Sequence, residues 1–208
     1  MQVLHIDSSI LGDASASRIL TAAIVDELRL DNPSATVVRR DLAVEAIPHL
    51  DGAIAAGFRA TGADDFDDAT RAEHARSEAL VNELLTSDVI VVGAPMYNFS
   101  VPSQLKAWID RVAQAGRTFK YTEKGPVGLA GGKKVIVAST RGGIHSNSPA
   151  GAVDFQEAYL KAVFGFLGIT DVQFVRAEGL AMGPDARTQA MAAAHAAMRD
   201  VVSQAVAA

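Results

Sequence analysis

Four serines follow the first apolar segment of the chain, in the stretch VLHIDSSILGDASASRIL that begins at Val3. The pattern predicts a strand, a loop and a helix, with Ser9, Ser15 and Ser17 around the helix N-terminus. That end carries free N–H groups and partial positive charge, which suit a phosphate. Neither a glycine-rich dinucleotide loop nor a Walker loop with its lysine is present. The hydroxyls therefore predict a monophosphate socket, although one serine alone would be an ordinary helix cap.

A second loop, GAPMYNFSVP, follows the strongly apolar segment DVIVVGAP that begins at Asp88. Met96, Tyr97 and Phe99 could contact the faces of a flat heterocycle, with the amide of Asn98 between the two aromatic residues. Backbone groups of the loop could meet the edge of such a ring, and the flanking prolines stiffen the loop. The alternative is that the aromatic side chains fill the core at the end of a strand.

A third loop, STRGGIH, contains the adjacent glycines Gly142 and Gly143. Two such glycines permit a close approach of the backbone to a ligand, or simply a tight turn. Arg141 or His145 could place positive charge near an anion. On the local sequence alone, a histidine in a surface loop is the favoured explanation of His145.

Apolar runs alternate with amphipathic segments along the whole chain, which is typical of a parallel sheet with helices on both faces and right-handed crossovers. In such a sheet, ligands bind outside the carboxyl ends of the strands. The three loops would therefore meet at one edge. Strands are predicted over 3–6, 36–39, 88–95, 133–140 and 172–178, and helices over 15–30, 71–85, 102–114, 155–167 and 185–206.

The segment from Val44 to Asp68 departs from this alternation, because it contains glycine and proline breakers and a group of aspartates. A loop of this length in a compact domain is often a functional lid. A solvated acidic surface is the alternative.

The bulk composition is that of a soluble globular domain, and we expect one domain over residues 1–208. The net charge is −5 without a basic cluster, so we expect no nucleic-acid partner. The absence of cysteine excludes disulfides and thiolate catalysis, and the histidines show no metal-ligand spacing. We see neither a signal segment nor an apolar run of about 18 residues, so we expect a cytoplasmic protein without a membrane span.

The strings SSILGDASAS, APMYNFSVPSQLKAWIDRVAQAGRTFKYTEKGPVGL, KKVIVASTRGGIH and FLGITDVQFVRAEGLAMGP resemble the FMN-dependent NADH-azoreductase and NAD(P)H:quinone oxidoreductase family. The resemblance extends in order over nearly the whole chain. It implies a flavodoxin-like fold with strand order 2-1-3-4-5 and one FMN per subunit. It also implies a homodimer with the flavins near the subunit interface.

The resemblance also assigns roles to particular residues. Tyr121 would form a wall of the substrate pocket from one subunit or the other, Arg59 would contact the nicotinamide nucleotide, and the segment 44–68 would govern substrate access. His145 and Asn98 could support the chemistry. The FMN phosphate would be held by Ser9, Ser15, Ala16 and Ser17, the isoalloxazine by Met96, Tyr97, Asn98 and Phe99, and its pyrimidine side by Thr140, Arg141, Gly142 and Gly143.

The implied reaction is a hydride transfer from NADH or NADPH to FMN, followed by two-electron reduction of a quinone or azo compound in the same position. This ping-pong scheme needs no metal and no protein nucleophile. Amides around Gly142 and Gly143 would stabilise negative charge on the reduced flavin.

Three other functions are alternatives to an oxidoreductase. A flavodoxin-type electron carrier, without NAD(P)H oxidation of its own, is the main alternative. A receiver module would need an acidic residue where Gly93 and Ala94 stand. A phosphodiesterase, the older name for this family, has no nucleophile or metal site to support it.

Overall fold

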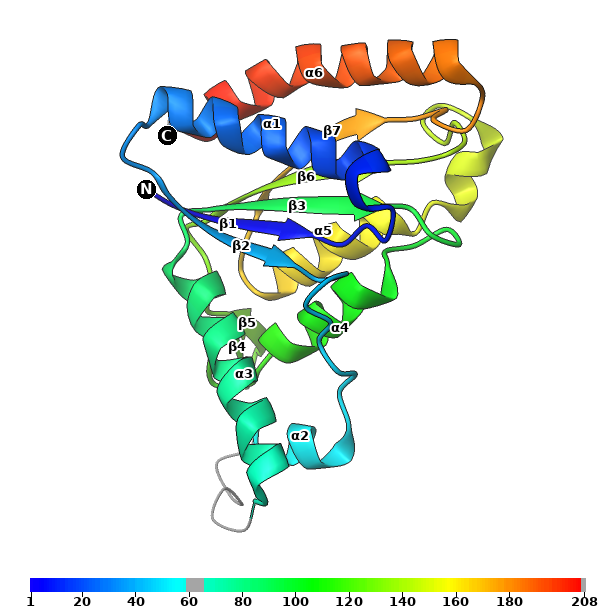
Figure 1. The fold of residues 1–208 in the computed structure, drawn as a ribbon. Coiled ribbons are helices and arrows are strands. Elements are labelled where there is room, and N and C mark those ends of the chain that lie inside the picture. Colours follow the sequence, from blue (N-terminus) through cyan, green and yellow to red (C-terminus); the bar gives the residue numbers. More distant parts are fainter. Residues whose placement is uncertain (59–65, 207–208) are drawn as a thin grey trace.

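The computed structural model describes residues 1–58 and 66–206 of the chain (Figure 1). Five parallel strands form one sheet in the order β2-β1-β3-β6-β7. This confirms the predicted order 2-1-3-4-5, because two short strands outside the sheet, β4 and β5, account for the difference in numbering. The strands of the sheet are β1 (Gln2–Asp7), β2 (Thr36–Asp41), β3 (Val89–Pro95), β6 (Lys134–Thr140) and β7 (Asp171–Ala177).

Helices cover both faces of the sheet, with α1 (Ala16–Asp31) and α6 (Pro184–Val206) on one face (Figure 1). The other face carries α3 (Asp68–Thr86), α4 (Ser103–Val112) and α5 (Gln156–Phe166). Successive residues of a strand point to opposite faces, so Val3 lies in the core under α1 and α6 and Leu4 lies in the other core. Burial on both faces explains the continuous apolar runs of the central strands. Within residues 1–58 and 66–206, none of the helices has the length and apolarity to cross a membrane.

The segment predicted as a long loop over 44–68 is partly helical. A short helix, α2 (Gly52–Ala56), begins after Asp51, whose carboxylate accepts a hydrogen bond from the Ile54 amide at 2.8 Å. Asp67 caps α3 in the same way through the Thr70 amide at 2.8 Å. Two of the aspartates thus belong to helix N-termini. Arg59, Asp64 and Asp65 lie outside the described residues.

The sequence analysis missed an antiparallel hairpin formed by β4 (Phe119–Thr122) and β5 (Gly125–Gly128). The hairpin packs against the C-terminal end of α5, where the ring centroids of Phe119 and Phe166 lie 4.5 Å apart. The chain passes from there through Gly168 into the first residue of β7. The hairpin therefore lies at the amino edge of the sheet, below the strands in Figure 1.

Backbone contact between Gly128 and Gly168 joins the hairpin to the sheet domain. A Cβ atom on Gly128 would lie 2.1 Å from the Gly168 amide nitrogen, and no side chain can move to relieve that overlap. We predict that Gly128→Ala lowers the free energy of unfolding by about 2 kcal/mol or more. The measurement is chemical denaturation followed by circular dichroism.

Gly165→Ala is the matched control, because a Cβ at this exposed position in α5 meets nothing within 4 Å. Alanine is the better helix former, so we expect this variant to be more stable by about 0.5–1 kcal/mol. Equal stability of the Gly128→Ala variant and the parent protein would contradict the proposed packing.

Candidate functional site

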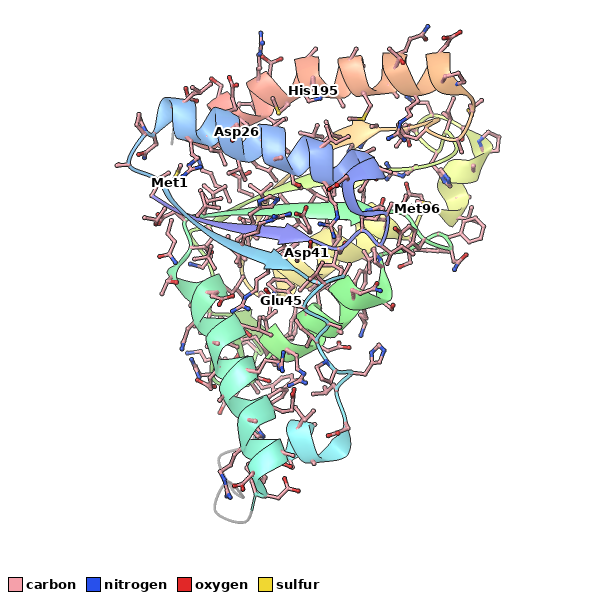
Figure 2. The ribbon with its side chains drawn as sticks, viewed as in Figure 1. Met1, Asp26, Asp41, Glu45, Met96 and His195 are labelled. Atoms are coloured by element: carbon pink, nitrogen blue, oxygen red, sulfur yellow. The ribbon has the colours of Figure 1, made fainter. Side chains whose placement is uncertain are left out.

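The loops that follow β1, β3 and β6 meet in a cleft of about 200 Å³ at the carboxyl edge of the sheet. The parallel register brings them together, because Asp7 pairs with Gly93 and Pro95 pairs with Thr140. Figure 2 shows Met96 at this edge and Met1 at the opposite end. The cleft is lined by Ser9, Leu11, Ser15, Ala16, Pro95, Met96, Tyr97, Thr140, Arg141, Gly142, Leu180, Ala181 and Arg187.

The first loop presents the N-terminus of α1 to this cleft. Ser15 is the N-cap, and its Oγ accepts a hydrogen bond from the Arg18 amide at 3.3 Å and lies 3.0 Å from Ser17 Oγ. Within the described part of the chain, the amides of Ala16 and Ser17 have no hydrogen-bond acceptor. Ser17 itself is buried below Ser15 and does not line the cleft. This helix end can therefore donate two backbone hydrogen bonds to an anion.

A buried carboxylate, Asp7, supports the first loop from behind. Thr21 Oγ1 donates to Asp7 Oδ1 at 2.8 Å and Arg39 Nη2 donates to Oδ2 at 3.0 Å. Burial by itself acts to raise the pKa of Asp7, but interactions with His5, Thr21 and Arg39 outweigh it and lower the pKa to about 2. Position 93 has little room for a side chain, because a Cβ there would lie 3.2 Å from Thr21 Cγ2 and 3.3 Å from Asp7 Oδ1.

Arg18 holds the backbone of the first loop in place. Its Nη2 donates to the Ser9 carbonyl at 2.9 Å and to Asp41 Oδ1 at 2.6 Å. The guanidinium hydrogen bonds also lower the pKa of the Asp41 carboxyl, against the opposing effect of burial. Ser9 is thereby fixed at the rim of the cleft by a side chain that does not line it.

The second loop turns back on itself at Asn98 and Phe99, whose φ angles are 49° and 70°. Mutual backbone hydrogen bonds between Tyr97 and Ser100, at 2.9 and 3.1 Å, close the turn. Positive φ at both central residues is typical of a type I′ turn, which normally contains glycine or asparagine. A phenylalanine there is strained by about 1 kcal/mol, and such strain is often found in functional loops.

Tyr97 connects the second loop to the first. Its hydroxyl lies 3.3 Å from Ser9 Oγ and accepts from the Ile10 amide at 3.3 Å. The Met96 amide donates to the Thr140 carbonyl at 2.8 Å, which joins the second loop to the third. Met96 and Tyr97 therefore line the cleft as the sequence analysis expects.

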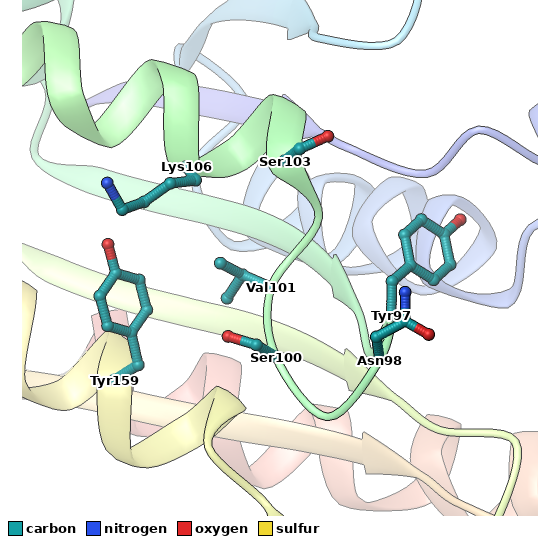
Figure 3. Close-up of a pocket in the computed structure, with 7 residues that line it drawn as sticks. All are labelled: Tyr97, Asn98, Ser100, Val101, Ser103, Lys106 and Tyr159. Atoms are coloured by element: carbon teal, nitrogen blue, oxygen red, sulfur yellow. The ribbon is translucent and has the colours of Figure 1, made fainter. Parts of the chain in front are cut away.

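Asn98 and Phe99 lie outside the cleft. Phe99 is 53% exposed, and Asn98 lines a second cavity of about 450 Å³ near the N-terminus of α4. Figure 3 shows the Tyr159 hydroxyl and Lys106 Nζ directed toward each other in that cavity. Burial, with a smaller effect from Asp110, raises the pKa of Tyr159 to about 12, so its hydroxyl is protonated at neutral pH.

The side chain of Arg141 does not offer its charge to the cleft. Its guanidinium is buried and forms ion pairs with Asp154 at 2.7 Å, Glu157 at 2.9 Å and Glu178 at 3.4 Å. A buried arginine requires such partners, since desolvation of an unpaired charge is costly. The structure thus differs from the expectation of positive charge near an anion, and Arg141 anchors the third loop instead.

The glycines of the third loop have free amides. The carbonyls of Gly142 and Gly143 accept from Ala181 and Gly179 at 3.0 and 2.9 Å, whereas their N–H groups have no acceptor among the described residues. A Cβ on Gly142 would lie 3.3 Å from the Ala181 Cβ, so the third loop packs closely against the loop after β7. Gly142 lines the cleft and Gly143 follows it in the same turn.

His145 and Tyr121 do not line the cleft of their own chain. His145 Nδ1 lies 3.1 Å from the Ala150 carbonyl, and its amide donates to Glu178 at 3.3 Å. Tyr121 is 73% exposed on β4, at the amino edge of the sheet. The sequence analysis missed Leu180, Ala181 and Arg187, because they follow β7 and approach the cleft only in the folded chain.

Comparison with known proteins identifies the family of this chain. Residues 1–202 match a family described as having a flavodoxin-like fold. The chain is 86% identical, over the full length of both proteins, to an FMN-dependent NADH:quinone oxidoreductase from Ralstonia nicotianae. The chain belongs to the FMN-dependent NADH:quinone oxidoreductase family.

Two solved structures are close in shape to this member of the oxidoreductase family. An azoreductase from Bacillus anthracis str. Sterne superposes with a TM-score of 0.89 at 30% identity, over 98% of this chain and 99% of that one. An FMN-dependent NADH-azoreductase from Bacillus anthracis str. Ames Ancestor, in complex with FMN, also has a TM-score of 0.89, at 27% identity over 98% of each chain.

The low pKa of Asp7 predicts how the stability of this oxidoreductase family member depends on pH. A carboxylate whose pKa falls on folding stabilises the protein above the pKa of the unfolded state, near 3.8, and loses that effect as the pH falls through about 2. We predict that Asp7→Asn lowers the free energy of unfolding by about 2 kcal/mol at pH 7. The deficit should shrink between about pH 4 and pH 2, as measured by denaturation at each pH.

Asp26→Asn is the control, since Asp26 is exposed on α1 (Figure 2). We expect this variant to stay within about 0.5 kcal/mol of the parent protein. A deficit of Asp7→Asn that does not change with pH would contradict an ionised role for Asp7.

Proposed function

We propose that this chain is an FMN-dependent NADH:quinone oxidoreductase that also reduces azo compounds, with FMN held in the cleft at the carboxyl edge of the sheet. The observation that carries the proposal is that four amides in two loops, those of Ala16, Ser17, Gly142 and Gly143, have no acceptor among residues 1–58 and 66–206. Ala16 and Gly142 line the same cleft, and Ser17 and Gly143 directly follow them in the chain. Unpaired backbone donors on this scale normally have a ligand or water as acceptor.

The donors of the first loop fit the phosphate of FMN. Ser15 and Ala16 line the cleft at the positive end of α1, and Ser9 lies beside them. These residues would bind the phosphate with hydroxyl and amide groups. Ser17 would act by orienting Ser15, because its own hydroxyl contacts Ser15 Oγ and is buried.

The donors of the third loop fit the pyrimidine side of the isoalloxazine. The amides of Gly142 and Gly143 would donate to it, and Thr140 and the backbone of Arg141 would complete this wall. Bound FMN supplies the redox chemistry, by accepting a hydride from NADH and passing two electrons to an acceptor. Fixed N–H donors would favour the reduced state because negative charge develops beside them.

Met96 and Tyr97 would form the opposite wall of the ring site, with Asn98 and Phe99 at its outer rim. Because Phe99 is exposed on a turn that Tyr97 and Ser100 hold closed, it offers an apolar surface to a flat substrate. We propose that NADH and the acceptor use this open side in turn, in a ping-pong sequence. NADH is a cytoplasmic reductant, and we place the reaction in the cytoplasm.

We also propose that the protein acts as a homodimer with the clefts near the interface. Large apolar side chains are exposed in loops at the carboxyl edge, namely Phe99 at 53%, Ile144 at 51%, Phe155 at 59% and Met182 at 61%. A second copy could cover this surface. Tyr121, on β4, does not line the cleft of its own chain. We therefore propose that the partner's Tyr121 forms a wall of the substrate pocket.

Anaerobic addition of NADH to the FMN-reconstituted protein tests the proposed function against a flavodoxin-type electron carrier. For the oxidoreductase we expect NADH alone to bleach the visible flavin absorbance, and a quinone to restore it. A carrier would keep its oxidised spectrum after NADH addition. Persistence of that spectrum would therefore overturn the proposal.

Removal of the two paired hydroxyls should weaken the phosphate site. We predict that the double variant Ser15→Ala, Ser17→Ala binds FMN about tenfold more weakly, because the hydrogen bond from Ser15 to the phosphate is lost together with the Ser17 hydroxyl that orients it. The measurement is quenching of flavin fluorescence. Ser203→Ala, at an exposed position of α6, is the control and should leave the affinity unchanged. Unchanged affinity in the double variant would count against the serine socket.

A further inference from the structure

Arg187, the fourth residue of α6, lines the same cleft as Ser15 and Ala16. Its Nη2 donates to the Ala14 carbonyl at 3.0 Å. Ala14 directly precedes the N-cap Ser15, so the guanidinium lies against the turn that leads into α1. The chain therefore brings a cation, 173 residues away from Ala14 in sequence, to the rim of the serine socket.

Arg187 forms no ion pair with the residues that the structure describes. Among residues 1–58 and 66–206, no carboxylate oxygen lies within 4.0 Å of its guanidinium. The other arginine that lines the cleft, Arg141, is paired with three carboxylates, and Arg18 behind the first loop is paired with Asp41. Arg187 thus differs from both in having positive charge to offer to a ligand.

Two helix N-termini lie beside Arg187. Arg187 stands in the first turn of α6, which also contains Asp185, and the N-terminus of α1 adds a second positive end beside it. A bound anion would be attracted by the Arg187 guanidinium and by both helix N-termini. A dianionic phosphate monoester at Ser15 and Ala16 is the ligand chemistry that this arrangement suits.

We propose that Arg187 is a phosphate-binding, specificity-determining residue that makes the cleft prefer FMN to riboflavin. The inference rests on the proposed function, because it takes FMN as the occupant of the cleft. It also revises the expectation that neutral hydroxyls and amides alone hold the phosphate. The guanidinium supplies the charged wall of the socket, and the serines and free amides supply the neutral wall.

A purely structural role is the competing explanation, in which Arg187 only ties α6 to Ala14. Arg187→Gln separates the two roles, because the amide side chain can still donate a hydrogen bond but has no charge. Arg187→Lys keeps the charge without the planar fork. Arg199→Ala removes the same charge from an exposed position about 18 Å further along α6 and serves as the control.

The experiment measures dissociation constants of FMN and riboflavin by fluorescence quenching, for the parent protein and all three variants, at low and high salt. We expect Arg187→Gln to weaken FMN binding about tenfold at low salt, with riboflavin binding changed less than about twofold. The FMN deficit should shrink at high salt, because the lost interaction is ionic. Arg187→Lys should retain most of the FMN affinity, and Arg199→Ala should retain all of it.

The results also separate this inference from the proposed function. If the parent protein binds no FMN, the proposed function fails. If the parent binds FMN but Arg187→Gln weakens FMN and riboflavin equally, or matches Arg199→Ala, then Arg187 is only a structural tie and the inference is overturned. Thermal unfolding of each variant without flavin checks that the comparison is made between folded proteins.

Discussion

Parallel pairing of β1, β3 and β6 decides where three separate loops of the chain meet. The register sets Asp7 beside Gly93 and Pro95 beside Thr140, so the turns after all three strands emerge at one edge. Backbone groups in these turns cannot extend the strand ladders, and several of their N–H groups have no acceptor in the part of the chain that the structure describes. The fold itself thus provides donors for a ligand, and the side chains mainly hold those donors in place.

Buried charges at this edge support the loops. Asp7 fixes the start of the first loop through Thr21 and Arg39, and Arg141 fixes the third loop through three carboxylates. Each buried charge has partners of opposite sign, which keeps it ionised and the loop rigid. Arg187 has no such partner among the described residues, so charge used for support and charge available for binding lie on different residues.

The sequence predicted the sheet well because each central strand is a run of apolar, β-branched residues between breakers, as at 88–95 and 133–140. The β4–β5 hairpin was not predicted because its strands have only four residues each and β5, with the sequence GPVG, consists mostly of glycine and proline, which are depleted in strands. Loops that follow strands were identifiable as site candidates, since parallel strands end at one edge. Contacts between distant segments could not be predicted in this way. The residues around Arg141 in the sequence do not indicate its ion pair with Glu178, and those around Arg187 do not indicate its hydrogen bond to Ala14.

A crystal structure of the protein with bound FMN tests the central claim most directly. The account predicts the phosphate within hydrogen-bond distance of Ser15 and of the Ala16 or Ser17 amide, with the ring edge at the Gly142 and Gly143 amides. Two results would contradict it. FMN could occupy the cavity beside Tyr159 instead, or the cleft could stay empty at saturating FMN because side chains fill it.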